Sequence, residues 1–95
     1  MVDEFEVRHA PERQRYEMWK GDELVGFSDA RVQGERVVMP HVEIMSAYEG
    51  QGLGSRLVRE SLDDVRSKGM KVVPLCPFVG GFLRRNPEYQ DLTEA

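Results

Sequence analysis

The sequence predicts an α+β fold with a mixed, mainly antiparallel sheet, a central helix and a short C-terminal helix. Two observations predict this class. The first half of the chain alternates apolar and polar residues in short segments separated by turn residues, which is the pattern of half-buried strands. From Leu53 onward the apolar residues recur at helical spacing instead, and a short apolar segment and a second helical segment follow.

The first half indicates an antiparallel meander of short strands. Turn residues stand at Pro11-Glu12, Gly21-Asp22 and Gln33-Gly34-Glu35. Pro40 cannot donate to a strand ladder, so we expect it to separate or bend the last two segments. The expected strands cover residues 5–10, 15–20, 24–32, 36–39 and 41–45.

The second half indicates a helix, a strand and a second helix. Lys68-Gly69 supplies a cation and a glycine stop at the end of the first helix. We expect a strand over 71–76, a helix over 78–85 after Pro77, and a tail or last turn over 88–95. A strand–helix–strand crossover that follows a meander predicts a mixed sheet. The apolar face of the first helix comprises Leu53, Leu57, Val58, Leu62 and Val65.

Length and composition narrow the functional classes. A chain of 95 residues predicts one domain, 1–95, and no apolar run approaches the ~20 residues of a membrane helix. The acidic start resembles no secretory signal, and Cys76 is the single cysteine, so we expect a reducing compartment, cytoplasmic or nuclear. The net charge of −4 argues against nucleic-acid binding, and no cysteine–histidine cluster predicts a metal site. Nothing indicates an oligomeric state.

The most informative segment is the glycine loop, residues 49–55, which lies between an expected strand and an expected helix start. Free backbone amides at a helix N-terminus favour an anion such as a phosphate or pyrophosphate. A dinucleotide-binding loop is excluded because Gly54 falls one residue early and Ser55 stands where a glycine is required. A Walker loop is excluded because no lysine follows the glycines.

The loop fits the acyl-CoA motif of the GNAT acetyltransferases, Arg/Gln-x-x-Gly-x-Gly/Ala. Gly52 and Gly54 occupy both glycine positions, whereas Glu49 departs from the Arg or Gln of the first position. Further segments are similar to the small Yjdj-type N-acetyltransferases, which are minimal GNAT-like proteins of about this length. These segments are His-Val-Glu-Ile, Gly-Gln-Gly-Leu-Gly-Ser, Lys-Val-Val-Pro-Leu-Cys-Pro-Phe and Asn-Pro-Glu-Tyr, within residues 41–92.

The resemblance implies acetyl-CoA, or coenzyme A, as the cofactor. Its pyrophosphate is expected to meet backbone amides, because Glu49 offers no favourable side chain. Its pantetheine arm is expected to add alongside strand 41–45 through the main chain of Val42 and Ile44. Asn86 either bonds the pantetheine or caps the helix before it. The expected pyrophosphate contacts are Gly50, Gln51, Gly52, Leu53, Gly54 and Ser55.

Three side chains are candidates for catalysis. Transfer of an acetyl group to an amine needs a base, and Glu43 and His41 share one face of their strand, so either is a candidate, directly or through water. Cys76 precedes Pro77 at an expected helix N-terminus. Its thiol is either a nucleophile that takes the acetyl group, an acid that protonates the leaving thiolate, or a buried small hydrophobe.

The resemblance therefore implies an acetyl-CoA-dependent N-acetyltransferase with an amine-bearing acceptor. Residues 1–50 carry 11 acidic and 6 basic side chains, which mildly favours a cationic amine such as a lysine, an N-terminus or a polyamine. The alternative is a non-catalytic acyl-CoA-binding sensor or adaptor. The resemblance favours it in two ways: this chain has a direct hairpin where ordinary GNAT enzymes have an N-terminal helical pair that shapes the acceptor pocket, so the acceptor side should be open, and Glu49 departs from the motif. The sequence does not identify the acceptor.

Overall fold

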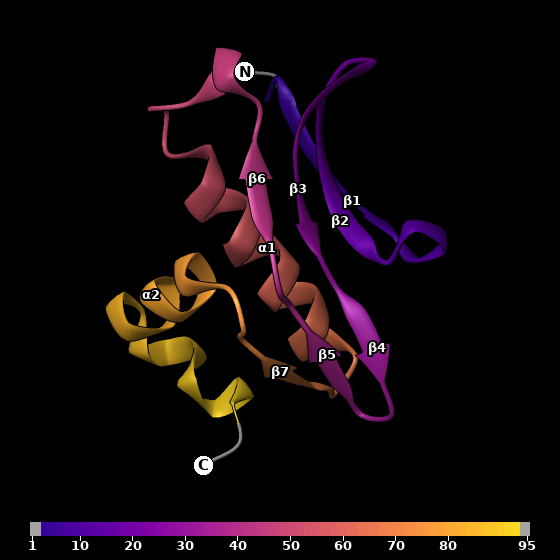
Figure 1. Ribbon diagram of the computed structural model, residues 1–95, viewed down its shortest axis with the longest axis vertical. Helices are drawn as coiled ribbons and strands as arrows, with labels where there is room; N and C mark the ends of the chain where they lie inside the picture. Colours follow the sequence, from indigo (N-terminus) through magenta and orange to yellow (C-terminus); the bar gives the residue numbers. More distant parts are fainter. Residues whose placement is uncertain (1–2, 94–95) are drawn as a thin grey trace.

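The computed structural model describes residues 3–93 and has two α-helices and seven strands in that range (Figure 1). The strands are β1 (Phe5–Ala10), β2 (Arg15–Lys20), β3 (Glu23–Asp29), β4 (Arg31–Gln33), β5 (Arg36–Val38), β6 (Val42–Ile44) and β7 (Lys71–Val73). The helices are α1 (Leu53–Ser67) and α2 (Pro77–Arg85), with short 3-10 helices η1 (Pro11–Arg13), η2 (Ser46–Tyr48) and η3 (Pro87–Leu92).

The strands form two sheets. The larger sheet has the order β1-β2-β3-β6 and is antiparallel throughout. The smaller sheet has the order β4-β5-β7, in which β4 and β5 are antiparallel and β5 and β7 are parallel. The predicted α+β class with a mixed, mainly antiparallel arrangement is confirmed, although two sheets replace the single expected one.

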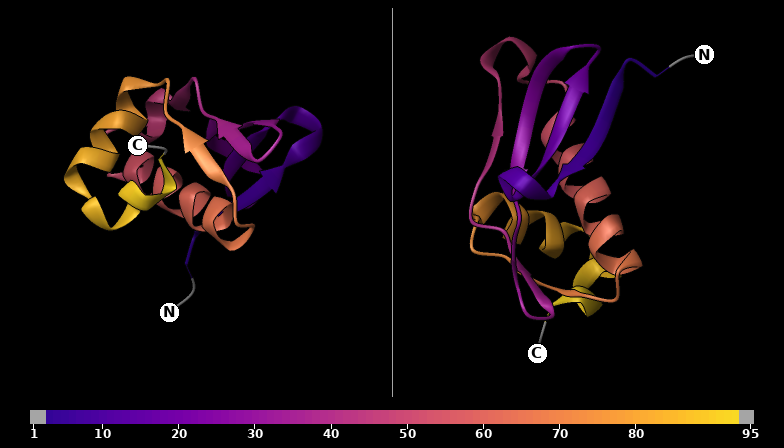
Figure 2. Two further views of the ribbon diagram at one scale, coloured as in Figure 1. Left: turned by 90° about the horizontal axis from the view of Figure 1, so that it is seen from below. Right: turned by 90° about the vertical axis from the view of Figure 1, so that its right-hand side faces the viewer.

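Helix α1 covers one face of the larger sheet and contacts all four of its strands (Figures 1 and 2). The helix forms because its apolar residues repeat on one side, and that side is fully buried. All five apolar residues predicted for this face are in the core, which also receives Met18 and Val25 from the sheet and Val79 and Phe82 from α2. Burial of this face anchors α1 against β6.

Two predicted strand boundaries are wrong. The expected strand over 24–32 is divided between β3 and β4, because the chain passes from one sheet to the other at buried Ala30, whose amide bonds the Gln14 carbonyl at 2.8 Å. The expected strand over 71–76 ends at Val73. Pro74 has no amide hydrogen to donate, and the Cys76 amide bonds the Met39 carbonyl instead, at 3.1 Å.

The remaining elements follow the expected order. The strand expected over 41–45 is β6, which is shorter by one residue at each end. The expected tail over 88–95 contains η3, and residues 94 and 95 lie outside the described range. No helix within residues 3–93 is both long enough and apolar enough to cross a membrane.

Candidate functional site

The glycine loop leads into α1 with its backbone amides free. Gly50 and Gly52 have φ angles of 81° and 74°, a region that L side chains rarely adopt, and Gly52 is the N-cap residue of the helix. The first helical hydrogen bond runs from the Arg56 amide to the Gly52 carbonyl at 3.3 Å. The amides before Arg56 therefore have no acceptor in the helix, and no side chain caps them. This helix end is suited to an anion.

Strand β6 forms the edge of the larger sheet and presents main-chain groups on its open side. The carbonyl of His41 accepts from Asp29, and the amide of Met45 donates to Val25, both at 2.8 Å. Hydrogen-bonding residues alternate along an antiparallel pair. The main-chain groups of Val42 and Ile44 therefore point away from β3, toward the open edge. An extended ligand can bond them there.

A groove of about 350 Å³ lies where the β6 edge meets the glycine loop and the start of α2. Seven of the nine residues predicted to bind the cofactor line it, which are Val42, Ile44, Gly50, Gly52, Leu53, Gly54 and Ser55. Gln51 lies in the loop without lining the groove, and Asn86 lies elsewhere. The structure thus gathers most of the predicted binding residues around one open cavity.

Three lining residues were not among the predicted site residues: Tyr48, Glu49 and Phe78. Phe78 stands at the start of α2 and is 40% exposed, which is unusual for a large apolar side chain. Its ring lies directly over Gly54, where a Cβ atom would come within 2.9 Å of the Phe78 Cζ. Gly54 is therefore needed for the close approach of this ring. Phe78 is part of the Cys-Pro-Phe segment, which was the available signal for it.

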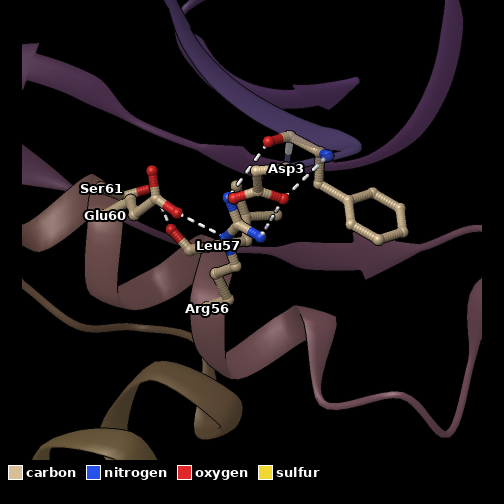
Figure 3. A network of polar contacts seen from close by, with 6 residues as sticks. Asp3, Arg56, Leu57, Glu60 and Ser61 are labelled. Carbon is tan, nitrogen blue, oxygen red and sulfur yellow. Dashed lines mark hydrogen bonds and ion pairs between the residues drawn. The ribbon is translucent and has the colours of Figure 1, made fainter. Parts of the chain in front are cut away.

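The groove carries a negative charge, which is unusual beside a helix end that is suited to an anion. Glu49 is the single charged residue among those that line it. Arg56, in the first turn of α1, does not line the groove, and its side chain reaches Asp3 and Glu60, as Figure 3 shows. Its guanidinium donates to Asp3 Oδ1 at 3.0 Å, to Glu60 Oε2 at 2.7 Å and to the Phe5 carbonyl at 3.1 Å. The hydrogen bonds that Arg56 donates to Asp3 and Glu60 raise the pKa of its guanidinium, so it stays a cation that is already paired.

His41 and Glu43 form a pair outside the groove. Their side chains are about half exposed, and His41 Nε2 lies 3.1 Å from Glu43 Oε1. The His41 ring also contacts the ring of Phe27, which pairs with Glu43 across the sheet. Side chains alternate along a strand, so this pair occupies the sheet face opposite to the one that carries Val42 and Ile44. The two predicted bases are thus together, but on the other side of β6.

Cys76 and Asn86 do not line the groove, and both side chains have structural positions in the fold. Cys76 is the N-cap residue of α2, is 7% exposed and belongs to the core, apart from the residues that line the groove. The Asn86 side-chain amide donates to the Phe82 carbonyl at 2.8 Å at the end of α2. This bond is the capping alternative predicted for Asn86.

The strand edge, the apolar groove wall and the free helix amides suit one class of ligand. That ligand has an extended arm with amide groups and an anionic end. Residues 15–92 match the family described as GCN5-related N-acetyl-transferase. The chain belongs to the GCN5-related N-acetyltransferase family.

Curated relatives are similar over part of their length. Protein NATD1 from Bos taurus and from Homo sapiens are each 31% identical to this chain over 55 residues, which cover 57% of this chain and 49% of theirs. Protein NATD1 from Gallus gallus matches to the same degree. The chain spans about half the length of the curated relatives it matches.

Solved structures share the fold. A GCN5-like protein from Staphylococcus aureus superimposes with a TM-score of 0.73 at 18% identity, covering 99% of this chain and 92% of its own. A Bacillus subtilis acetyltransferase in complex with CoA has a TM-score of 0.56 at 23% identity, covering 66% of this chain and 43% of its own. The Escherichia coli ribosomal-protein-S18-alanine N-acetyltransferase has a TM-score of 0.59 at 13% identity, covering 78% and 43%.

Proposed function

We propose that this chain is an acetyl-CoA-dependent N-acetyltransferase that moves an acetyl group to an amine acceptor. The observation that carries the proposal is the groove, because it joins the open edge of β6 to the free amides at the start of α1. Family membership and the fold shared with a CoA-bound acetyltransferase support the same reading. Residues 1–95 would act as one catalytic domain in the cytoplasm.

Two elements of the fold would each hold a different part of the ligand. The amides of Gly50 to Ser55 would hold the diphosphate, where the α1 dipole favours negative charge. The main chain of Val42 and Ile44 would bond the pantetheine arm as an added strand does. Acetyl-CoA would supply the acetyl group as an activated thioester. The residues present fit this ligand at its arm, since the groove wall is apolar and the strand edge is open.

The His41–Glu43 pair is the proposed base. An amine is protonated at neutral pH and must lose a proton before it attacks a carbonyl. The pair is half exposed and hydrogen-bonded, so it can accept that proton and share it between an imidazole and a carboxylate. Because it lies on the face opposite Val42, it would serve an amine that approaches β6 from that face. A cationic amine, such as a lysine, an N-terminus or a polyamine, remains the proposed acceptor.

Steady-state turnover of acetyl-CoA with a panel of amines tests the proposal. Glu43→Ala and His41→Ala should each lower amine-dependent CoA release, by about 10²-fold or more for the residue that acts as the base. Glu35→Gln, an exposed change in the β4–β5 turn, is the matched control and should leave turnover unchanged. Unchanged turnover in both base variants would exclude this pair from catalysis.

Cys76 is the proposed site of a covalent alternative. In that route the thiolate would attack the thioester, take the acetyl group and release CoA thiolate, and the amine would then attack the acetyl-cysteine. Intact mass spectrometry after incubation with acetyl-CoA separates the routes. An adduct of one acetyl group in the wild type that disappears in Cys76→Ser supports the intermediate. Absence of any adduct in the wild type favours direct attack by the amine.

A non-catalytic acyl-CoA sensor or adaptor is the second candidate. Two observations favour it: the exposed face that carries His41 and Glu43, and the carboxylate of Glu49 at the groove. Tight CoA binding without amine-dependent CoA release, over a broad panel of amines, would support the sensor and exclude the transferase.

A further inference from the structure

Glu49 places a negative charge where an anionic ligand is expected. Its carboxylate belongs to a residue that lines the groove beside Gly50 and Gly52. Within residues 3–93, Glu49 has no ion pair and no side-chain hydrogen bond, and it is exposed. Within the described residues, no partner offsets the charge of this carboxylate. It therefore acts on any phosphate bound to the neighbouring amides.

No cation in the groove offsets this carboxylate. The other nine lining residues are uncharged. The nearest basic residue along the chain, Arg56, is bound to Asp3 and Glu60 on the side of the helix that faces the N-terminal segment (Figure 3). Two carboxylates and a carbonyl already occupy its guanidinium donors. Lys20 does not line the groove, but its Nζ lies 5.9 Å from the ring centroid of Tyr48, which does, and 3.7 Å from Glu4 Oε1. Among the lining residues, the helix end therefore attracts phosphate through its amides and its dipole.

On the basis of the function proposed above, we propose that Glu49 sets the affinity of the groove for its ligand by repelling the phosphate-bearing end. The site then recognises acyl thioesters mainly through the pantetheine arm, at the apolar wall and at the β6 edge. Replacing Glu49 with a neutral residue should tighten binding of CoA and leave binding of a phosphate-free pantetheine unchanged. Glu49 is thus a determinant of specificity between these two thioester carriers.

Calorimetric or NMR titration with CoA and with pantetheine tests this role in Glu49→Gln. Glutamine keeps the shape of the side chain and removes the charge. At low ionic strength we expect the Kd for CoA to fall by roughly three- to tenfold, as for a unit charge removed within several ångström of a phosphate in water. The difference should shrink at roughly 0.2 M salt, where charges are screened beyond ~7–8 Å. Glu35→Gln, with the same change of charge far from the groove, should bind CoA as the wild type does.

Several outcomes would overturn the role of Glu49. Unchanged or weaker CoA binding in Glu49→Gln contradicts it, and weaker binding confined to buffers with Mg²⁺ would show the carboxylate acting as a metal ligand. An equal change for pantetheine would show an effect of shape, not of charge. If neither the wild type nor the variant binds CoA at millimolar concentration, the proposed function itself fails. If both bind equally, that function stands and only this inference falls.

Discussion

The glycines of the loop have different physical roles at the residue scale. Gly52 is required for its backbone conformation, since its φ of 74° is strained for any L side chain. Gly54 leaves space for the Phe78 ring, because a Cβ atom at this position would come within 2.9 Å of the Phe78 Cζ. The motif predicted both positions but not these reasons. The role of Gly54 depends on a residue in α2, and a contact between distant segments leaves no mark in local sequence.

Gly54→Ala should therefore weaken ligand binding without unfolding the protein. The added methyl group displaces the Phe78 ring, which can move because it is partly exposed. Alanine favours the helix by up to ~1 kcal/mol, which offsets the cost of moving the ring. We expect the free energy of unfolding to change by less than about 1 kcal/mol and the Kd for CoA to rise about fivefold, as for the loss of one apolar contact.

Urea denaturation and CoA titration measure the two effects separately. Gly80→Ala in α2 is the matched control, since the nearest atom to its added Cβ lies at 3.7 Å and belongs to the end of the Arg84 side chain. The double variant Gly54→Ala/Phe78→Leu should recover part of the binding, because leucine relieves the clash. CoA binding equal to that of the wild type in Gly54→Ala would show that Phe78 does not shape the ligand site.

The candidate catalytic side chains also show what local sequence predicts. Alternation along the strand placed His41 and Glu43 on one face, and the structure places them in contact. The burial of Cys76 was left open, because it depends on how α2 packs against the rest of the core. The same holds for Asn86, whose amide bonds the end of its own helix. The contact between two neighbouring side chains of one strand was predictable from the sequence, whereas the burial of a side chain such as Cys76 was not.

At the scale of elements, the spacing of apolar residues predicted whether a segment is a helix or a strand better than it predicted where the segment begins and ends. Helix α1 was predicted together with its buried face, because apolar residues that recur at helical spacing over four turns indicate an amphipathic helix. The break between β3 and β4 was missed because Ala30 and Val32 alternate with the polar residues Asp29 and Arg31, as in a continuous strand. A hydrogen bond from the Ala30 amide to the Gln14 carbonyl accompanies the passage between the sheets. Such tertiary bonds override a local pattern.

A cluster of four polar side chains ties α1 to the first two strands. Tyr16 donates to Asp64 at 2.6 Å, and Lys68 Nζ lies 2.7 Å from Asp64 and 3.0 Å from His9 Nδ1. The His9 ring stacks on Tyr16 with centroids 4.5 Å apart. Burial and the Lys68 cation lower the pKa of His9, against the opposing effects of Asp64 and Glu12. His9 thus accepts a hydrogen bond from Lys68 in its neutral form.

This cluster predicts a loss of stability as the pH falls. The pKa of His9 is lower in the folded protein than in the unfolded chain, where it is about 6.5, so the unfolded chain binds the proton more tightly. The stabilisation is fully present above about pH 6.5 and is lost as the pH falls through the folded pKa. Urea denaturation at about pH 7.5 and at about pH 5.5 should show a smaller difference in unfolding free energy for His9→Gln than for the wild type.

Gly80→Ala in α2 serves as the control for this pH dependence. The change removes and adds no titratable group, so it should keep the wild-type difference between the two pH values. Asp64 remains charged in this window, because hydrogen bonds from Lys68 and Tyr16 outweigh its burial and lower its pKa. An unchanged pH dependence in His9→Gln would exclude His9 as the titrating group.

At the scale of the whole molecule, the site exists because the two sheets separate. Strand β6 ends the larger sheet, whereas β7 pairs with β5 in the smaller one (Figure 1). Residues of β6, of the start of α1 and of the start of α2 line the groove. The sequence motifs predicted the contribution of residues 42–55, which are adjacent along the chain. They did not predict the contribution of Phe78, because α2 is distant from residues 42–55 along the chain and tertiary packing sets its position beside the groove.

In the proposed site, CoA binds the groove through the β6 edge and the amides at the start of α1. Backbone amide NMR shifts during a CoA titration measure this binding residue by residue, since each amide reports its own surroundings. We expect the largest shifts at Val42, Ile44 and Gly50 to Ser55, with strand β4 (Arg31–Gln33) unaffected. Saturating CoA that leaves these amides unshifted, or that shifts another surface most strongly, would contradict it.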